Sequence, residues 1–158
     1  MRNSNEGEAQ KEIFSSLKRF LSFRERTEYE VRAYLQKKDF APEDIEHAIA
    51  ELKKREVIND SRFAQLYVSD SIMILRKGPV RIRRELESLG LDREEIERLL
   101  GQETVQKELE SVLREEIRKS ITRSSITSDQ RRRLVNKFLR KGFEYERIIA
   151  SLNELIDN

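Results

Sequence analysis

The stretch Lys77-Gly-Pro-Val-Arg-Ile-Arg-Arg-Glu-Leu-Glu-Ser-Leu-Gly-Leu91 (KGPVRIRRELESLGL) carries the pattern that decides the fold. Its apolar residues Ile82 and Leu86 are four apart, so they lie on one face of a helix. Gly90 can adopt the left-handed conformation that ends a helix at low steric cost. Leu91 then packs into the space between this helix and the next. The stretch therefore predicts a short amphipathic helix, a tight turn and the start of a second helix.

The same spacing of apolar residues occurs three times in the chain. The three series are Val31, Leu35, Phe40, Ile45, Ile49 and Leu52; Ile82, Leu86, Leu91, Ile96 and Leu100; and Leu134, Phe138, Phe143, Ile148, Leu152 and Leu155. The turn positions Asp39, Gly90 and Gly142 recur every 51 to 52 residues. Similarity at a fixed period of this length is typical of repeat proteins, in which each unit buries its apolar face against its neighbours.

Helix starts and further helices complete each repeat. The segment 27–30 (TEYE) is a capping-box pattern, Pro42 suits a first helical position, and Asp92 suits an N-cap. Third helices are predicted at about 60–75 and 103–121, and an extra N-terminal helix at about 13–23. Residues 1 to about 10 are polar and are expected to fray.

The predicted fold is all-α: about three tandem three-helix repeats, the last one truncated, forming an elongated, curved array. The predicted boundaries are 1–25 for the N-terminal tail and extra helix, 26–76 for repeat 1, 77–124 for repeat 2 and 125–158 for repeat 3. Such an array presents a long surface rather than a deep pocket, which favours a macromolecular partner.

The composition fits short helices and excludes other classes. Charged residues make up 39% of the 158 residues, hydrophobic residues 37%, and the net charge is +2. Glycine and proline occur too often for a sustained coiled coil. There is no cysteine, so disulfides and cysteine-based metal sites are excluded. No apolar run is long enough for a membrane span and no signal peptide is recognisable. We expect a soluble, cytoplasmic protein.

The small net charge hides a segregated distribution. Residues 76–84 carry five cations and no acid, and residues 118–141 carry nine cations, Arg123 among them, against Asp129 alone. The segment 85–110 is rich in acids. Lys77, Arg81 and Arg84 lie three or four residues apart, so we expect them to share one bare, basic helix face. Clustered cations attract phosphates or an acidic protein surface. The candidate partner-binding or DNA-binding residues are Lys77, Arg81, Arg83, Arg84, Arg131, Arg132, Lys137, Arg140 and Lys141.

Several motifs together resemble the RecX family of bacterial recombination regulators. They are RERTEYEVRAYL at 24–35, INDSRFA at 58–64, Lys77-Gly78 with the helix that follows, and KGF at 141–143. The resemblance runs from about Ile13 to Leu155. Asp39 stands where the family pattern has glycine, and Asn59-Asp60 where it often has Asp-Asp. Aspartate tolerates the left-handed turn better than most residues, so the fold is unaffected.

The resemblance implies a regulator with no chemistry of its own. Proteins similar to this one are tandem three-helix repeats that bind the RecA filament on single-stranded DNA and mostly restrain its assembly, ATP turnover and strand exchange in recombination and DNA repair. The implied partners are the RecA filament and the DNA within it, with no membrane, small-molecule substrate or cofactor.

Other interpretations remain open from the residues alone. A cationic helix face is often only a solvated surface with local ion pairs. A DNA-binding protein without sequence preference and without a recombinase partner is the main alternative, because three-helix units can resemble helix-turn-helix modules. Against it, no helix carries a base-reading cluster of Asn, Gln and Arg. A helical adaptor for another partner is the third candidate.

An enzyme is not expected. The sequence contains no phosphate-binding glycine loop, zinc-protease motif or nucleophile elbow. His47 is the single histidine and has no second ligand cluster, so no metal site is predicted. No catalytic residues are assigned.

Overall fold

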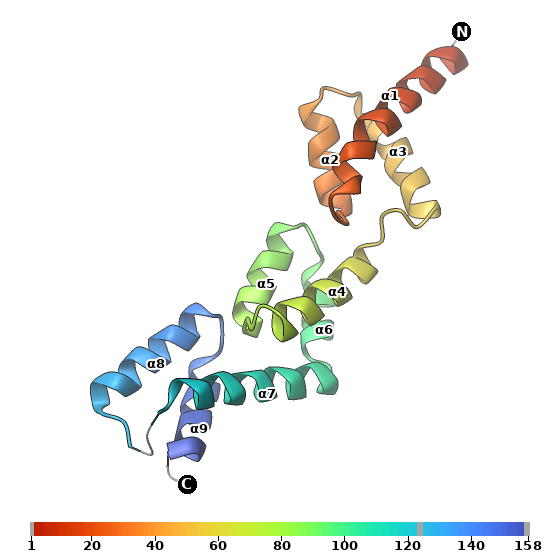
Figure 1. Cartoon of the computed structure of the whole chain (residues 1–158). Coiled ribbons are helices and arrows are strands. Elements are labelled where there is room, and N and C mark those ends of the chain that lie inside the picture. Colours follow the sequence, from red (N-terminus) through yellow and green to blue (C-terminus); the bar gives the residue numbers. More distant parts are fainter. Residues whose placement is uncertain (1, 123–124, 157–158) are drawn as a thin grey trace. The chain divides into compact units, whose positions relative to one another are not determined.

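The computed structural model describes residues 2–122 and 125–156, and the secondary-structure elements of these residues are all α-helices (Figure 1). They are α1 (Arg2–Ser22), α2 (Glu28–Lys37), α3 (Pro42–Lys54), α4 (Asp60–Met73), α5 (Pro79–Ser88), α6 (Arg93–Leu100), α7 (Glu103–Ser120), α8 (Ser128–Arg140) and α9 (Tyr145–Ile156). The predicted all-α fold is confirmed. The predicted boundary at residue 124 and the candidate cation Arg123 lie outside the described residues.

The chain divides into two compact units. The first contains the described residues up to Ala64 together with Leu89–Leu91. The second contains Gln65–Ser88 and the described residues from Asp92 onward. The division therefore falls inside α4.

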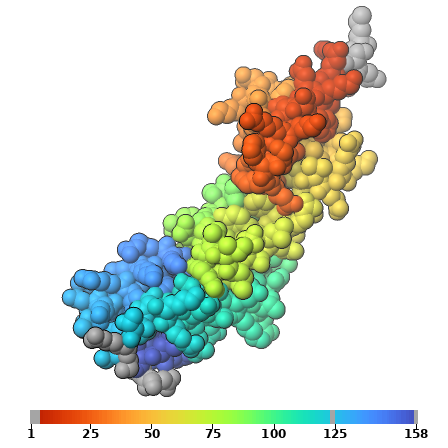
Figure 2. Space-filling model, in the orientation of Figure 1, coloured from red at the N-terminus to blue at the C-terminus, as the bar shows by residue number. Residues whose placement is uncertain are grey.

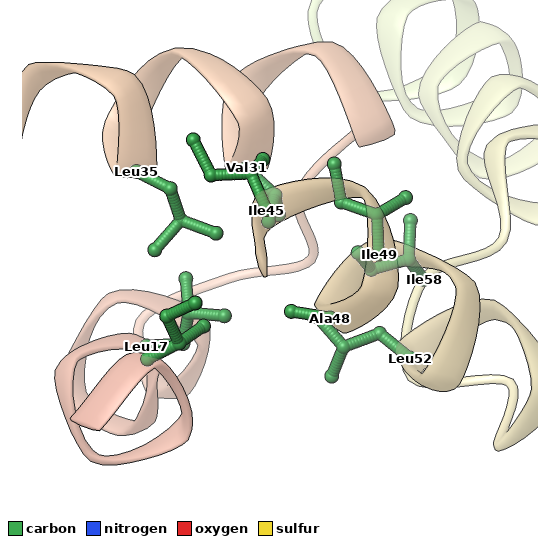
Figure 3. Close-up of a cluster of buried hydrophobic side chains, with 9 residues drawn as sticks. Leu17, Val31, Leu35, Ile45, Ala48, Ile49, Leu52 and Ile58 are labelled. Atoms are coloured by element: carbon green, nitrogen blue, oxygen red, sulfur yellow. The ribbon is translucent and has the colours of Figure 1, made fainter. Parts of the chain in front are cut away.

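The core of the first unit lies where α1, α2 and α3 meet. Side chains from these helices and from the segment after α3 converge on one another (Figure 3). The buried residues of this cluster are Ile13, Leu17, Val31, Leu35, Ile45, Ala48, Ile49, Leu52 and Ile58. Those that belong to the first apolar series are buried as predicted, and Phe40 packs half-buried against them.

Helix α1 begins much earlier than predicted. It starts at Arg2 rather than near residue 13, so the expected frayed tail is helical in the described residues. The Gln10 side-chain amide donates a hydrogen bond to the Asp44 carbonyl at 3.0 Å, which ties this part of α1 to α3. The polar composition of residues 2–10 concealed the helix because an exposed helical turn needs no apolar stripe.

The predicted helix caps are present. Thr27 and Glu30 form a complete capping box at α2, and the Asp92 side chain accepts hydrogen bonds from the amides of Glu94 and Glu95 at α6. Pro42 occupies the first turn of α3. The sequence therefore determines where these helices begin through local hydrogen bonding.

The turns after α2, α5 and α8 share one backbone conformation. The φ angles of Asp39, Gly90 and Gly142 are 62°, 81° and 96°, in the left-handed region predicted for them. In each unit one such turn packs against the start of an earlier helix. The Leu89 carbonyl accepts a hydrogen bond from the Thr27 hydroxyl at 2.8 Å, and the Lys141 carbonyl accepts one from the Gly78 amide at 2.8 Å.

In the second unit, α9 packs against α7 and α8, and α6 packs against α5 and α7. Side chains fill the spaces between these ribbons, as the green-to-blue surface in Figure 2 shows. All five residues of the second apolar series are buried, as predicted; four belong to this unit and Leu91 to the first. In the third series, Phe138, Phe143, Ile148 and Leu152 are buried, whereas Leu134 and Leu155 are half-buried.

Candidate partner-binding surface

The candidate residues at the start of α5 are organised around one carboxylate. Glu85 accepts hydrogen bonds from the Lys77 ammonium at 2.7 Å, the Arg81 guanidinium at 2.9 Å and the Tyr67 hydroxyl at 2.6 Å. The Lys77 side chain is only 13% exposed and precedes the first residue of α5. Lys77, Arg81 and Arg84 therefore do not form the bare cationic helix face that their spacing predicted.

These contacts fix the charge of Glu85. Burial raises the pKa of its carboxyl group, but the hydrogen bonds from Lys77, Tyr67 and Arg81 outweigh this effect and lower the pKa to about 2. Glu85 is therefore ionised at neutral pH and balances part of the positive charge around it.

Arg83 and Arg84 are adjacent in sequence but differ in their surroundings. Arg83 forms an ion pair with Glu97, and the hydrogen bond from Arg83 to Glu97 raises the pKa of its guanidinium group. The pair lines a cavity of about 170 Å³ whose other walls come from α6, α7 and α9. Arg84 is exposed and forms no ion pair within the described residues. Of the two, Arg84 is the one with a cationic group free for a partner.

The candidates on α8 also divide into paired and free cations. The Arg131 guanidinium donates a hydrogen bond to Asn153 at 2.6 Å, and Arg132 pairs with Asp129 at 3.1 Å while remaining 76% exposed. The Lys137 ammonium donates a hydrogen bond to the Ser120 hydroxyl at 3.0 Å. Arg140 is exposed and has no ion-pair partner in the described part of the chain.

Lys141 belongs to a cluster of cations around Glu116 on α7. The Glu116 carboxylate lies 3.6 Å from both the Arg76 guanidinium and the Lys141 ammonium, and 3.4 Å from the Lys119 ammonium. Arg76 also pairs with Glu115 at 3.2 Å. Three cations thus share two carboxylates, which leaves an excess of positive charge at this point.

The start of α5 and the end of α8 meet directly. The Gly78 amide donates a hydrogen bond to the Lys141 carbonyl at 2.8 Å, and the Val80 amide donates one to the Gly142 carbonyl at 2.9 Å. The two predicted basic segments are therefore joined by backbone contacts. We call this region the basic joint; its cations are Arg76, Lys77, Arg81, Lys119 and Lys141.

A groove lies beside the basic joint, between the end of α7 and the start of α8. Its lining contains two cations, four hydroxyl groups and no carboxylate. The lining residues are Ser120, Thr122, Ser125, Ile126, Thr127, Gln130, Arg133, Leu134 and Lys137. Hydroxyl and guanidinium donors without a competing carboxylate are suited to phosphate oxygens. We call this the α7–α8 groove.

Most groove residues were not among the predicted candidates. Arg133 is exposed and free of ion pairs in the described residues. Arg118 on α7 is also exposed and unpaired there, but it lies outside the groove. The available signal was the run of serine and threonine at 120–127 between two cationic helices. Such a run has the same composition as an ordinary linker between repeats, so it does not by itself indicate a groove.

The described residues contain no group of three or more His, Cys, Asp or Glu side chains placed to hold a metal ion. None of the helices described is long and apolar enough to cross a membrane.

Family models identify the repeats. The model for the first three-helix domain of RecX matches residues 16–52, and the model for the second matches residues 59–100. The chain belongs to the RecX family. The first matched range covers the end of α1 together with α2 and α3, and the second covers α4, α5 and α6. Each range begins one helix earlier than the corresponding predicted repeat. The predicted repeat boundaries stay a prediction.

Relatives named regulatory protein RecX support the same assignment. The protein from Bacillus pumilus is 34% identical over 96% of this chain and 58% of its own length. The proteins from Listeria monocytogenes and Oceanobacillus iheyensis are 33% and 36% identical, over 85% and 79% of this chain and 51% and 46% of their own lengths. The chain thus spans about half the length of these curated relatives.

Solved RecX structures have the same fold. The crystal structure of RecX from Lactobacillus salivarius has a TM-score of 0.76 and 26% sequence identity, over 94% of this chain and 97% of that one. A second structure, of a regulatory protein RecX, has a TM-score of 0.75 at 22% identity, over 97% of this chain and 73% of that one. The second comparison bears on the fold alone. Tandem helical repeats are thereby confirmed as the architecture.

Proposed function

We propose that this protein binds the filament that RecA forms on single-stranded DNA and modulates it, mostly by inhibiting its assembly, ATP turnover and strand exchange. Membership of the RecX family supports a regulatory role. The observation that carries the proposal is the carboxylate-free α7–α8 groove next to the basic joint. The protein acts by binding, without a reaction of its own.

The groove and the free cations suit the DNA strand inside such a filament. Arg118 and Arg133 have no internal carboxylate partner in the described residues, so they lose no ion pair when they bind a phosphate. Binding of cations to DNA releases condensed counterions, which favours association at low salt. The hydroxyl groups of the groove add hydrogen-bond donors that position a strand without reading its sequence.

The basic joint supports a larger contact that includes protein. Its cations are held by Glu85, Glu115 and Glu116, and they keep an excess of positive charge. The rim of a protein–protein interface is polar and solvent-accessible, so charged residues of this kind are compatible with one. A surface that combines free cations with fixed ion pairs fits a nucleoprotein partner better than it fits bare DNA.

The test is the ATP turnover of preassembled RecA filaments on single-stranded DNA, titrated with this protein at fixed salt. A fall at substoichiometric protein indicates capping of filament ends or net disassembly. A fall only near stoichiometry indicates coating along the filament. Unchanged turnover at saturating protein contradicts the proposal.

A parallel titration of bare single-stranded DNA separates the alternative function. A DNA-binding protein without a recombinase partner would bind bare DNA tightly, with a steep dependence on salt, and leave ATP turnover unchanged. The proposed regulator binds bare DNA more weakly than the filament.

A further inference from the structure

An unusual group of apolar side chains is exposed at the end of α4. Met73, Ile74 and Leu75 are consecutive and are 50%, 70% and 56% exposed, and Leu66 lies two turns earlier with 52% exposed. Single exposed apolar residues are common on protein surfaces, whereas contiguous ones mark interaction sites. The yellow-green surface at the end of α4 lies on the face shown in Figure 2. We call Met73–Leu75 the α4 patch.

The backbone beneath the α4 patch is fixed. The amides of Ile74 and Leu75 donate hydrogen bonds to the Asp70 carbonyl at 3.0 and 3.1 Å, and the Lys77 amide donates one to the Ser71 carbonyl at 2.9 Å. Directly after the patch, the Arg76 side chain is held by two carboxylates of α7. The apolar side chains are therefore presented on an ordered turn, which lowers the entropic cost of binding.

Helix α7 shows that the fold does not need an apolar residue at these positions. Helices α4 and α7 are the third helices of the first two predicted repeats, and each buries residues four apart: Ala64, Val68 and Ile72 in α4, and Leu109, Leu113 and Ile117 in α7. Met73, Ile74 and Leu75 follow the last buried residue of α4, whereas Arg118, Lys119 and Ser120 follow the last buried residue of α7. The equivalent face of α7 is thus polar and cationic. Packing within the fold therefore does not explain why the α4 patch is apolar.

The surroundings of the patch define the chemistry of a partner. Arg76 and Lys77 directly follow the patch in sequence, and the exposed Asp70 is the one acid between Leu66 and Lys77. The basic joint, to which Arg76 and Lys77 belong, has five cations against Glu85, Glu115 and Glu116. An apolar surface with a positive border complements apolar side chains flanked by carboxylates. The patch carries no aromatic ring, and exposed bases stack on aromatic rings or guanidinium planes. The patch therefore fits protein rather than nucleic acid.

We propose that the α4 patch docks a protein segment that presents apolar side chains among acidic residues. The inference rests on the function proposed above, and it assigns the patch to the protein component of the filament. The α7–α8 groove is left to the DNA. Contact with RecA and contact with the strand then use separate residues and can be removed one at a time.

The experiment compares the double variant Ile74→Ser/Leu75→Ser with the wild-type protein. Binding is measured by fluorescence anisotropy on RecA filaments assembled on a labelled oligonucleotide, and on the same oligonucleotide bare. We expect the variant to bind the filament at least tenfold more weakly and the bare strand within twofold of wild type. Val57→Ser, which changes an exposed apolar residue outside the patch, serves as the matched control and should behave as wild type. Both variants should melt at the wild-type temperature.

Each contrary result has a distinct meaning. If wild-type protein does not bind the filament, the proposed function is wrong and the docking inference fails with it. If wild-type protein binds and the double variant binds equally well, the docking inference alone is wrong. If the double variant loses affinity equally for the filament and for the bare strand, the patch contacts DNA. If the variant loses self-association, measured by sedimentation, the patch binds a second copy of this chain. Either result overturns the inference.

Discussion

The backbone amide of Gly78 donates a hydrogen bond to the carbonyl oxygen of Lys141 across a distance of 2.8 Å. This contact joins the start of α5 to the turn after α8, and the amide of Val80 reinforces it through the carbonyl of Gly142. The basic joint exists because these two segments touch. Its integrity therefore depends on how closely the two backbones can approach.

Replacing Gly142 by alanine should weaken this joint. Gly142 has a φ of 96°, and a Cβ atom there would lie 2.4 Å from the Cβ atom of Arg81. The left-handed conformation and the forced shift of α5 both disfavour alanine, so we expect Gly142→Ala to lower the free energy of unfolding by about 2–4 kcal/mol. Urea unfolding followed by circular dichroism measures this change.

Gly7→Ala provides the control. Gly7 lies in α1, and a Cβ atom added there would meet no neighbouring atom within 4 Å. Alanine should therefore leave stability unchanged or raise it by up to about 1 kcal/mol through helix propensity. Equal stabilities of the Gly142 and Gly7 variants would show that the turn can move away from α5 at no cost.

Local sequence patterns predicted the helices and the turns between them, because helix caps and turn conformations depend on residues that are neighbours in the sequence. Thr27, Gly90 and Gly142 have the conformations and contacts that their residue types predict. Helix α1 was predicted too short because residues 2–10 are polar and show no apolar periodicity. Apolar spacing reports burial, and a helix that is largely exposed gives little of that signal.

The sequence predicted the partner-binding surface less completely than the helices. Which charged side chains pair depends on contacts between residues far apart in the chain. The spacing of Lys77 and Arg81 suggested free cations, but both are held by Glu85. No sequence pattern indicated that the turn after α8 would bring Lys141 to the start of α5. Nor could spacing show that Met73–Leu75 would stay exposed, since an apolar run predicts burial by default.

Ionisation of the Glu85 carboxylate should make the free energy of unfolding depend on pH. Its folded-state pKa is about 2, against 4.5 for the free group, so its stabilising contribution is complete above about pH 4.5 and is lost as the pH falls towards 2. At pH 7 we expect Glu85→Gln to be less stable by roughly 1–2 kcal/mol, a value reduced for solvent screening. The difference from wild type should shrink between pH 4.5 and 2, as measured by urea unfolding at several pH values.

Glu87→Gln is the matched control, because Glu87 lies on the same helix and its carboxylate forms a longer ion pair, of 3.7 Å, with Arg93. It should follow the wild-type curve across this pH range. A Glu85→Gln variant with the same acid dependence as wild type would show that its three hydrogen bonds do not form in solution.

The core assignment of α5 can be tested at Leu86, which is fully buried. Leu86→Ala removes buried methyl groups and leaves a cavity, so we expect the free energy of unfolding to fall by about 2–5 kcal/mol. Leu75→Ala makes the same chemical change at an exposed site and should alter stability by less than about 0.5 kcal/mol. Similar losses in both variants, measured by thermal and urea unfolding, would contradict the assigned orientation of α5.

The α7–α8 groove can be tested through the salt dependence of binding. If Arg133 contacts a phosphate of single-stranded DNA, Arg133→Gln should weaken binding and reduce the slope of log K against log salt by about 0.7, the value for one phosphate contact. Arg93→Gln is the control, because Arg93 is 80% exposed on α6 and does not line the groove. Measurements on bare single-stranded DNA and on RecA filaments, at about 50 to 200 mM salt, give both slopes. An unchanged slope for Arg133→Gln on both substrates would place the DNA outside the groove, whereas a reduced slope on the filament alone would mean that RecA positions the strand there.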